Sequence, residues 1–159
     1  NHNYDNFSRI IKISNPDIDE ETNKFLYDIS NGSPGLINEY EFDEILNIFE
    51  RLINLIINKD PFSDSNNDTI KFLSTLDNEK LKVFISFIKF ILITINKIKL
   101  GIDITKNYLS KSILKIETIS DNLSIDLIQR KLDYLIINEN DLFTFNLDKK
   151  IFMINFTTE

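Results

Sequence analysis

The sequence holds few side chains from which a catalytic site could be built. Its one histidine, His2, lies next to the first residue, and it contains no cysteine. A Ser-His-Asp arrangement needs a histidine held inside a fold, whereas the ends of a chain are seldom rigid. Neither the GxxxxGKS/T pattern nor the GxGxxG pattern of phosphate-binding loops occurs. We therefore predict no catalytic residue, no nucleotide hydrolysis and no cofactor.

Two acidic stretches come nearest to a metal-binding pattern. The oxygens of residues 64–68 alternate as at the start of a calcium loop, but Thr69 and Thr75 stand where such a loop needs Gly and a bidentate Glu. A solvated loop over residues 60–68 is expected instead, with Asp68 capping the next helix. The carboxylates of residues 17–21 suit the positive end of a helix dipole. We predict no metal ion at either stretch.

The composition disfavours nucleic acid as a direct partner. The 159 residues include 18 Lys and Arg against 25 Asp and Glu, which gives a formal net charge of −7. Proteins grip nucleic-acid backbones by neutralising phosphates, and no Lys/Arg-rich run provides a patch for this. Most of the 13 Phe and 5 Tyr share stripes with Ile and Leu, which indicates core packing rather than base stacking. Little direct nucleic-acid binding is expected.

The remaining composition fits a cytoplasmic globular chain. Hydrophobic residues make up 42% and charged residues 27%, as in one compact domain or a small domain joined to a moderate one. The absence of cysteine excludes disulfides and fits a reducing compartment. No initiator Met and no signal-peptide pattern opens the chain, so we expect a fragment of a longer protein. Because Ile is abundant and alanine absent, helix propensity is low and periodicity is the better guide.

The pattern of residues 1–41 predicts three short helices. The first carries apolar residues at three- and four-residue spacing until Pro16 interrupts it. The second opens on the acidic residues 17–21 and ends at Gly32, which suits a left-handed cap. Ser33-Pro34 then suits the start of a third helix. Gly35 is expected where a side chain would obstruct close packing.

Longer helices are predicted in the rest of the chain. Residues 41–58 carry an amphipathic stripe, and residues 77–99 form the most apolar stretch, as in a central core helix. Lys82 and Lys89 interrupt that stretch, and its apolar run is shorter than the ~20 residues that cross a bilayer, so no membrane partner is expected.

Three more helices complete the prediction. They are expected over residues 105–119, after a cap at Ser124, and after a cap at Asn146. The last is preferred to a strand because Asp148-Lys149-Lys150 interrupts the alternation before it. Glu139 and Asp141 are interpreted as solvated polar groups near a helix end.

Two short stretches resemble one protein family. Gly32-Ser33-Pro34-Gly35 is similar to the turn in the small helical lid of the delta-prime subunit of the bacterial DNA polymerase III clamp loader. Asn146-Leu147-Asp148-Lys149 resembles a stretch that opens the last helix of some delta-prime subunits. The predicted order of helices between them also fits. The resemblance covers nearly the whole chain, as the C-terminal half of that family.

The resemblance implies an all-α fold in two parts. Residues 1–41 would form a three-helix lid of the AAA+ type, and residues 42–159 a helical collar. The collar would assemble with other clamp-loader subunits, so that the sliding clamp is loaded on primed DNA in the cytoplasm. Pro34, Gly35 and Leu36 stand where related ATP-binding subunits carry a nucleotide-sensing Arg. This departure fits a subunit without activity of its own.

Two other hypotheses stay open. The chain could be a free-standing helical adaptor that binds another protein through an apolar groove. It could also be a DNA-binding helical domain, in which case its affinity would fall steeply with salt. The clamp-loader hypothesis predicts that part of residues 77–99 or 41–58 contacts other subunits, because these stretches carry more apolar surface than one small core requires.

Overall fold

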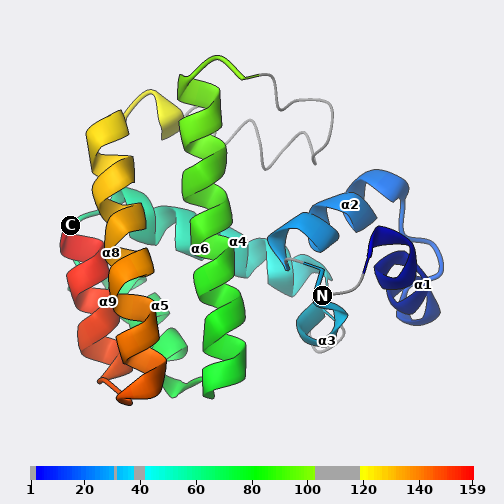
Figure 1. Cartoon of the computed structure of the whole chain (residues 1–159), viewed down its shortest axis with the longest axis horizontal. Coiled ribbons are helices and arrows are strands. Elements are labelled where there is room, and N and C mark those ends of the chain that lie inside the picture. The colour runs from blue at the N-terminus through cyan, green and yellow to red at the C-terminus, as the bar shows by residue number, and fades with distance from the viewer. Residues whose placement is uncertain (1–2, 31, 38–41, 103–118) are drawn as a thin grey trace.

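The computed structural model describes residues 3–30, 32–37, 42–102 and 119–159, and every regular element within them is an α-helix. The expected all-α fold is confirmed. A group of short helices at the N-terminal side stands next to a bundle of longer helices (Figure 1). None of the helices in these residues combines the length and the hydropathy that crossing a bilayer requires.

The N-terminal group comprises α1 (Tyr4–Ser14), α2 (Glu20–Ile29) and α3 (Pro34–Ile37). Side chains cap the first two helices: Asn3 Oδ1 accepts a hydrogen bond from the Asn6 N–H at 3.0 Å, and Asp19 Oδ1 from the Thr22 N–H at 2.8 Å. Such caps satisfy backbone donors that the first helical turn leaves free. As predicted, the chain breaks between α1 and α2, at Pro16.

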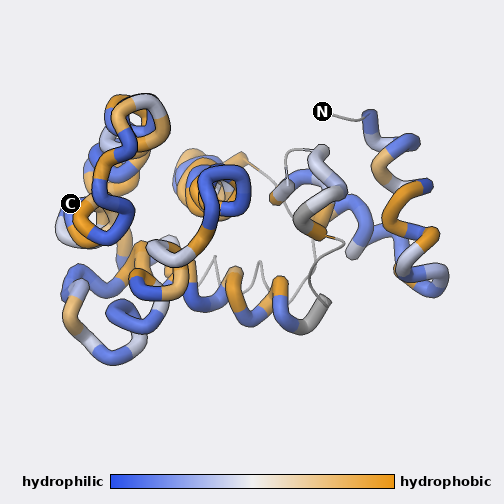
Figure 2. The backbone as a smooth tube through the Cα atoms, turned by 90° about the horizontal axis from the view of Figure 1, so that it is seen from below, coloured by the Kyte–Doolittle hydropathy of each residue, from blue (hydrophilic) through white to orange (hydrophobic). Residues whose placement is uncertain are grey.

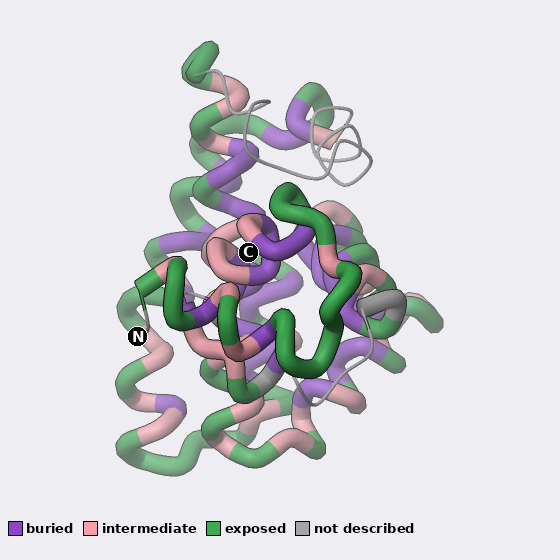
Figure 3. The backbone as a smooth tube through the Cα atoms, turned by 90° about the vertical axis from the view of Figure 1, so that its right-hand side faces the viewer, coloured by how far each residue is buried: buried purple, intermediate pink, exposed green. Residues whose placement is uncertain are grey.

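The bundle comprises α4 (Phe42–Ile57), α5 (Asp64–Thr75), α6 (Asn78–Lys99), α8 (Ile125–Thr144) and α9 (Lys149–Thr158). α6 packs most extensively against α8, while α5 packs against α4 and α9. α4 runs across the molecule from the N-terminal group into the bundle (Figure 2). Buried stretches alternate with exposed ones along the helices, as amphipathic faces require (Figure 3).

The longest of the described helices, α6, is the central core helix that the sequence predicts. Its buried side chains are Leu81, Phe84, Ile85, Phe87, Ile88, Ile91, Leu92, Thr94 and Ile95. The chain's own helices therefore cover most of the apolar surface that the sequence suggested for partners. Ile93 is the exception within α6, because 44% of it is exposed.

One aromatic residue joins the N-terminal group to the bundle. Phe25 of α2 is 1% exposed, and its ring meets Phe49 of α4 and Phe90 of α6 edge-on at centroid distances of 5.3 and 6.4 Å. Edge-to-face ring pairs stabilise packing beyond the area they bury. A buried apolar side chain thus contributes to the contact between the two groups.

The expected loop over residues 60–68 is wrong in its second half. α5 begins at Asp64 and is preceded by Ser63, so Asp68 lies within the helix and does not cap it. Asn66 explains the early start: its fully buried side-chain amide donates to the carbonyl oxygens of Asn58 and Asp60 at 2.8 and 2.9 Å. These two hydrogen bonds close the connection between α4 and α5 against the first turn of α5. Of the helix expected over residues 105–119, residues 105–118 lie outside the described residues.

Candidate functional site

The turn that resembles a clamp-loader lid has the predicted backbone. Gly32 has a φ of 72°, and its N–H donates to the carbonyl of Tyr27 at 2.9 Å, which closes the end of α2. α3 then begins at Pro34. The role expected for Gly35 is wrong, since a Cβ atom there would meet no other atom within 4 Å. The Gly32–Gly35 turn therefore ends one helix and starts the next.

The second family-like stretch, Asn146 to Lys149, is organised differently from the prediction. Asn146 does not cap α9; it has a φ of 53° and forms the left-handed turn after α8. The cap is Asp148, whose Oδ1 accepts the Ile151 N–H at 2.9 Å. Lys149 Nζ donates to the carbonyl of Leu76 at 2.6 Å and so ties α9 to the end of α5. The two family-like stretches lie in different parts of the molecule (Figure 1).

A buried lysine in α8 is the most unusual charged group of the bundle. Lys131 is 0% exposed, and its Nζ donates to the carbonyl oxygens of Phe156 at 2.7 Å and Thr157 at 3.0 Å. These carbonyls belong to the last turn of α9, where no intrahelical donor reaches them. Burial lowers the pKa of Lys131 to about 8, with a further lowering by Lys59.

Sequence reasoning missed Lys131, although a pattern was available. It stands four residues after Leu127 and four before Leu135, so it lies on the apolar stripe of its helix. A lysine on such a stripe either extends its amine to the surface or finds acceptors inside. Only the position of α9 decides between the two, and here it provides the acceptors. The role of Lys131 is to complete the C-terminal end of α9.

An ion pair fixes the register of α6 against α8. Lys89 Nζ bonds to Glu139 Oε2, and both side chains are about one-quarter exposed. The expectation that Glu139 is simply solvated is therefore wrong. Lys82, two turns earlier in α6, lies 5.1 Å from the ring centroid of Phe143, one turn later in α8. The two helices consequently run antiparallel.

This register brings exposed apolar side chains together. Ile93 follows Lys89 by one turn, and Ile136 precedes Glu139 by one turn, so we infer that both lie at the same level, beside the ion pair. They are 44% and 63% exposed. Leu100, two turns after Ile93, and Ile125, three turns before Ile136, are also exposed. Each lies on the same helix face as the isoleucine from which it is counted. We define the α6–α8 seam as Lys89, Ile93, Leu100, Ile125, Ile136 and Glu139.

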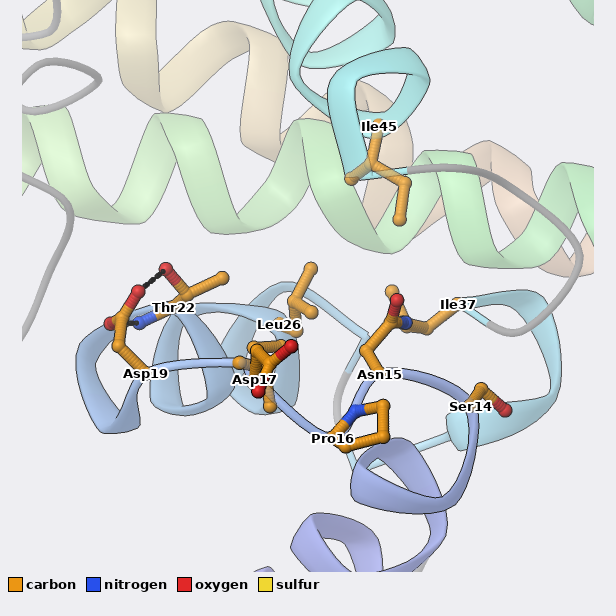
Figure 4. A pocket seen from close by; sticks show the side chains of 10 residues that line it. Ser14, Asn15, Pro16, Asp17, Asp19, Thr22, Leu26, Ile37 and Ile45 are labelled. Carbon is orange, nitrogen blue, oxygen red and sulfur yellow. Dashed lines mark hydrogen bonds between the residues drawn. The ribbon is translucent and has the colours of Figure 1, made fainter.

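A pocket of about 300 Å³ lies where the N-terminal group meets the bundle (Figure 4). Leu26 of α2, Ile37 of α3 and Ile45 of α4 provide its apolar wall, and each is 2% exposed. Its other lining residues come from the end of α1, the α1–α2 turn and the start of α2: Ser14, Asn15, Pro16, Asp17, Ile18, Asp19 and Thr22. We call it the junction pocket.

The carboxylate of Asp19 in the junction pocket is held by its own helix. Its Oδ1 accepts the Thr22 N–H and its Oδ2 accepts the Thr22 hydroxyl, both at 2.8 Å (Figure 4). The backbone hydrogen bond from Thr22 is the main cause that holds the pKa of Asp19 below its usual value. Asp17 makes no hydrogen bond or ion pair with a described residue. Within the pocket, Asp19 is thus the cap of a helix and Asp17 is an uncommitted carboxylate beside it.

These features do not assemble into a reaction centre. Within residues 3–30, 32–37, 42–102 and 119–159, no three His, Cys, Asp or Glu side chains group as metal ligands would. Lys131 is inaccessible, and its amine donates two hydrogen bonds to backbone carbonyls. What the described surface offers is contact area: the α6–α8 seam and the junction pocket. Comparison of the chain with protein-family models, with curated proteins and with solved structures gave no significant match.

Proposed function

We propose that this chain is a non-catalytic assembly module, similar to the lid and collar of a bacterial clamp-loader delta-prime subunit. In this proposal the bundle binds other clamp-loader subunits in the cytoplasm, and the sliding clamp and primed DNA are reached only through them. The sequence resemblance at Gly32–Gly35 and at Asn146–Lys149 supports it. A small group of three helices followed by a bundle of longer helices is compatible with it.

The observation that carries the proposal is the α6–α8 seam. Ile93 and Ile136 expose apolar side chains beside the partly exposed pair Lys89–Glu139. Protein interfaces combine an apolar centre with polar groups around it. Single exposed apolar residues are common on any surface, but here the register of two helices aligns several of them. Other large apolar side chains of the bundle, such as Ile137, Phe145 and Ile151, are exposed as well, so the seam is distinguished by the alignment of its residues and not by exposure alone.

The proposal is tested by sedimentation velocity at micromolar concentration, with the chain alone and mixed with the other clamp-loader subunits of the same organism. The expected result is a faster-sedimenting complex. The double change Ile93→Glu and Ile136→Glu should abolish it, because two charges would be desolvated without partners. Ile13→Glu is the matched control, since Ile13 is 80% exposed on α1, away from the seam. Absence of association with every loader subunit would refute the proposal.

A free-standing helical adaptor is the alternative proposal, and the junction pocket favours it. That pocket is a concave site, and three helices of this chain, α2, α3 and α4, provide its apolar wall. An adaptor would bind a protein other than a loader subunit. The sedimentation experiment separates the two functions, because an adaptor leaves every loader subunit sedimenting at its own rate.

A further inference from the structure

We propose that the junction pocket receives a lysine side chain from a partner protein. The pocket lies at the lower end of the range for small-ligand sites, roughly 300–1,000 Å³. A volume of about 300 Å³ suits one long side chain better than a helix or a nucleotide. This inference does not depend on the α6–α8 seam, which lies on other elements.

The lining of the junction pocket is complementary to lysine along its length. The apolar wall of Leu26, Ile37 and Ile45 can cover the four methylene groups of a lysine. Asp17 and Asp19 can then face its ammonium group. Among the described residues that line the pocket, none is basic, so no lining residue of that set neutralises these carboxylates.

The state of the two carboxylates leaves only Asp17 for a two-pronged contact with a guanidinium group, whereas an ammonium group can use the charge of both aspartates. A guanidinium group binds best when both oxygens of one carboxylate are free for a two-pronged contact. Both oxygens of Asp19 already accept hydrogen bonds from Thr22. An ammonium group needs only a nearby negative charge and single acceptors. Asp17, at the exposed α1–α2 turn, can provide these without losing a contact to a described residue.

The same features disfavour other occupants. Phosphates and carboxylates would be repelled by the pair of aspartates. A metal ion would need several free oxygen ligands, whereas the oxygens of Asp19 are committed. A purely apolar side chain would leave the carboxylates partly desolvated without compensation. A lysine side chain provides methylene groups for the apolar wall and a positive charge for the two carboxylates.

The proposal is tested by NMR titration of the full chain with the capped tripeptide Gly-Lys-Gly. Amide shifts are expected at Asp17, Thr22 and Leu26, and the matched peptide with norleucine in place of lysine should bind about tenfold more weakly. Asp17→Asn should weaken binding of the lysine peptide about fourfold, and Asp17→Lys should abolish its binding. Asp121→Asn is the control, because it removes the same charge from an exposed turn elsewhere.

Each other outcome overturns the proposal. Equal binding of the norleucine peptide would show an apolar site without charge selectivity. Equal weakening by Asp121→Asn would show attraction to the acidic chain as a whole. Shifts with spermidine but not with the lysine peptide would assign the pocket to a free polyamine. The double change Ile93→Glu and Ile136→Glu should leave the titration unaltered, so a failure here is distinct from a failure at the α6–α8 seam.

Discussion

The N-terminal group and the bundle differ in how their helices are stabilised. α6 alone buries nine side chains among its neighbours, so the bundle has a core of its own. Between them, α1 and α2 bury fewer large side chains, and one of these, Phe25, packs into the bundle. Small units bury too small a fraction of their surface to be stable alone. We therefore expect the N-terminal group to be folded because it is docked.

Removing the docking ring is the strongest way to separate the two regions. Phe25→Ala should cost about 3–5 kcal/mol through the cavity it leaves. Because Phe25 belongs to the smaller region, hydrogen exchange should accelerate in α1 and α2 while α6 and α8 keep their protection. Phe84→Ala, a matched change inside the bundle, should reduce protection in every helix. An equal loss of exchange protection in α2 and α6 after Phe25→Ala would show that the two regions unfold as one.

Among the residues that the structure describes, the one buried cation, Lys131, lies in the bundle and gives it a distinct pH dependence. The folded pKa of Lys131 is about 8, below its ordinary value of 10.5. The unfolded chain therefore binds the extra proton between these values, and the free energy of unfolding should rise with pH there. The rise should reach up to about 3 kcal/mol. Urea unfolding at a series of pH values measures it.

Lys131→Met provides the reference for this measurement. The difference in unfolding free energy between wild type and variant should grow across the window, while effects of other groups cancel. The neutral amine still has two N–H donors for the carbonyls of Phe156 and Thr157, so deprotonation need not break either bond. A difference that stays constant with pH would mean that Lys131 is not desolvated in the folded chain.

Equivalent helix caps should have unequal consequences in the two regions. Asp19→Ala and Asp148→Ala each remove a side chain that accepts an N-terminal N–H, a loss of about 1 kcal/mol. In the N-terminal group the loss should appear as faster exchange in α2, with little change in global unfolding. In the bundle, Asp148→Ala should lower the global free energy of unfolding itself. Calorimetry together with hydrogen exchange distinguishes these results.

The pH dependence of the Asp19 cap is a further test of the smaller region. Because the Thr22 N–H holds the pKa of Asp19 below its usual value of 3.8, the cap contributes stability above that value. Its contribution should be lost as the pH falls through the lowered pKa. Asp19→Ala should remove this acid dependence from the exchange of α2. If the dependence persists, another carboxylate is responsible for it.

The smallest expected effects come from two glycines, one in each region. Gly35→Ala should stabilise α3 by about 0.5–1 kcal/mol, because a Cβ meets nothing there and alanine favours helix. Gly101→Ala should instead destabilise the bundle by about 1 kcal/mol, because Gly101 has a φ of 71°. Thermal unfolding of both variants gives the comparison. A loss of stability in Gly35→Ala would instead support the expectation from the sequence that Gly35 is closely packed.

Much of the helical framework was predictable because it depends on neighbours in the sequence. The cap at Ser124, the break at Pro16 and the left-handed turn at Gly32 are all present as expected. The errors fall where a distant residue intervenes. Residues 64–68 became helical because Asn66 binds the carbonyls of Asn58 and Asp60, and residue-by-residue polarity gave no sign of that.

The candidate sites were less predictable than the framework. The stretches singled out for a family resemblance proved to be helix ends. Two residues of the acidic stretch 17–21, Asp17 and Asp19, proved to line a pocket whose apolar wall comes from α2, α3 and α4. The exposed pair Ile93 and Ile136 could not be distinguished from core residues, because they occur among many similar isoleucines. Which isoleucine stays exposed depends on the register between α6 and α8.

By itself, the sequence determined that this chain is helical, where most of its helices begin and end, and that it lacks the residues of familiar catalytic motifs. Those properties follow from backbone preferences and from the spacing of residues along the sequence. The tertiary structure alone decided that Lys131 is buried, that Glu139 is paired, and that Asp17 faces an apolar wall. The physical reason is that burial and pairing depend on which distant helices pack together.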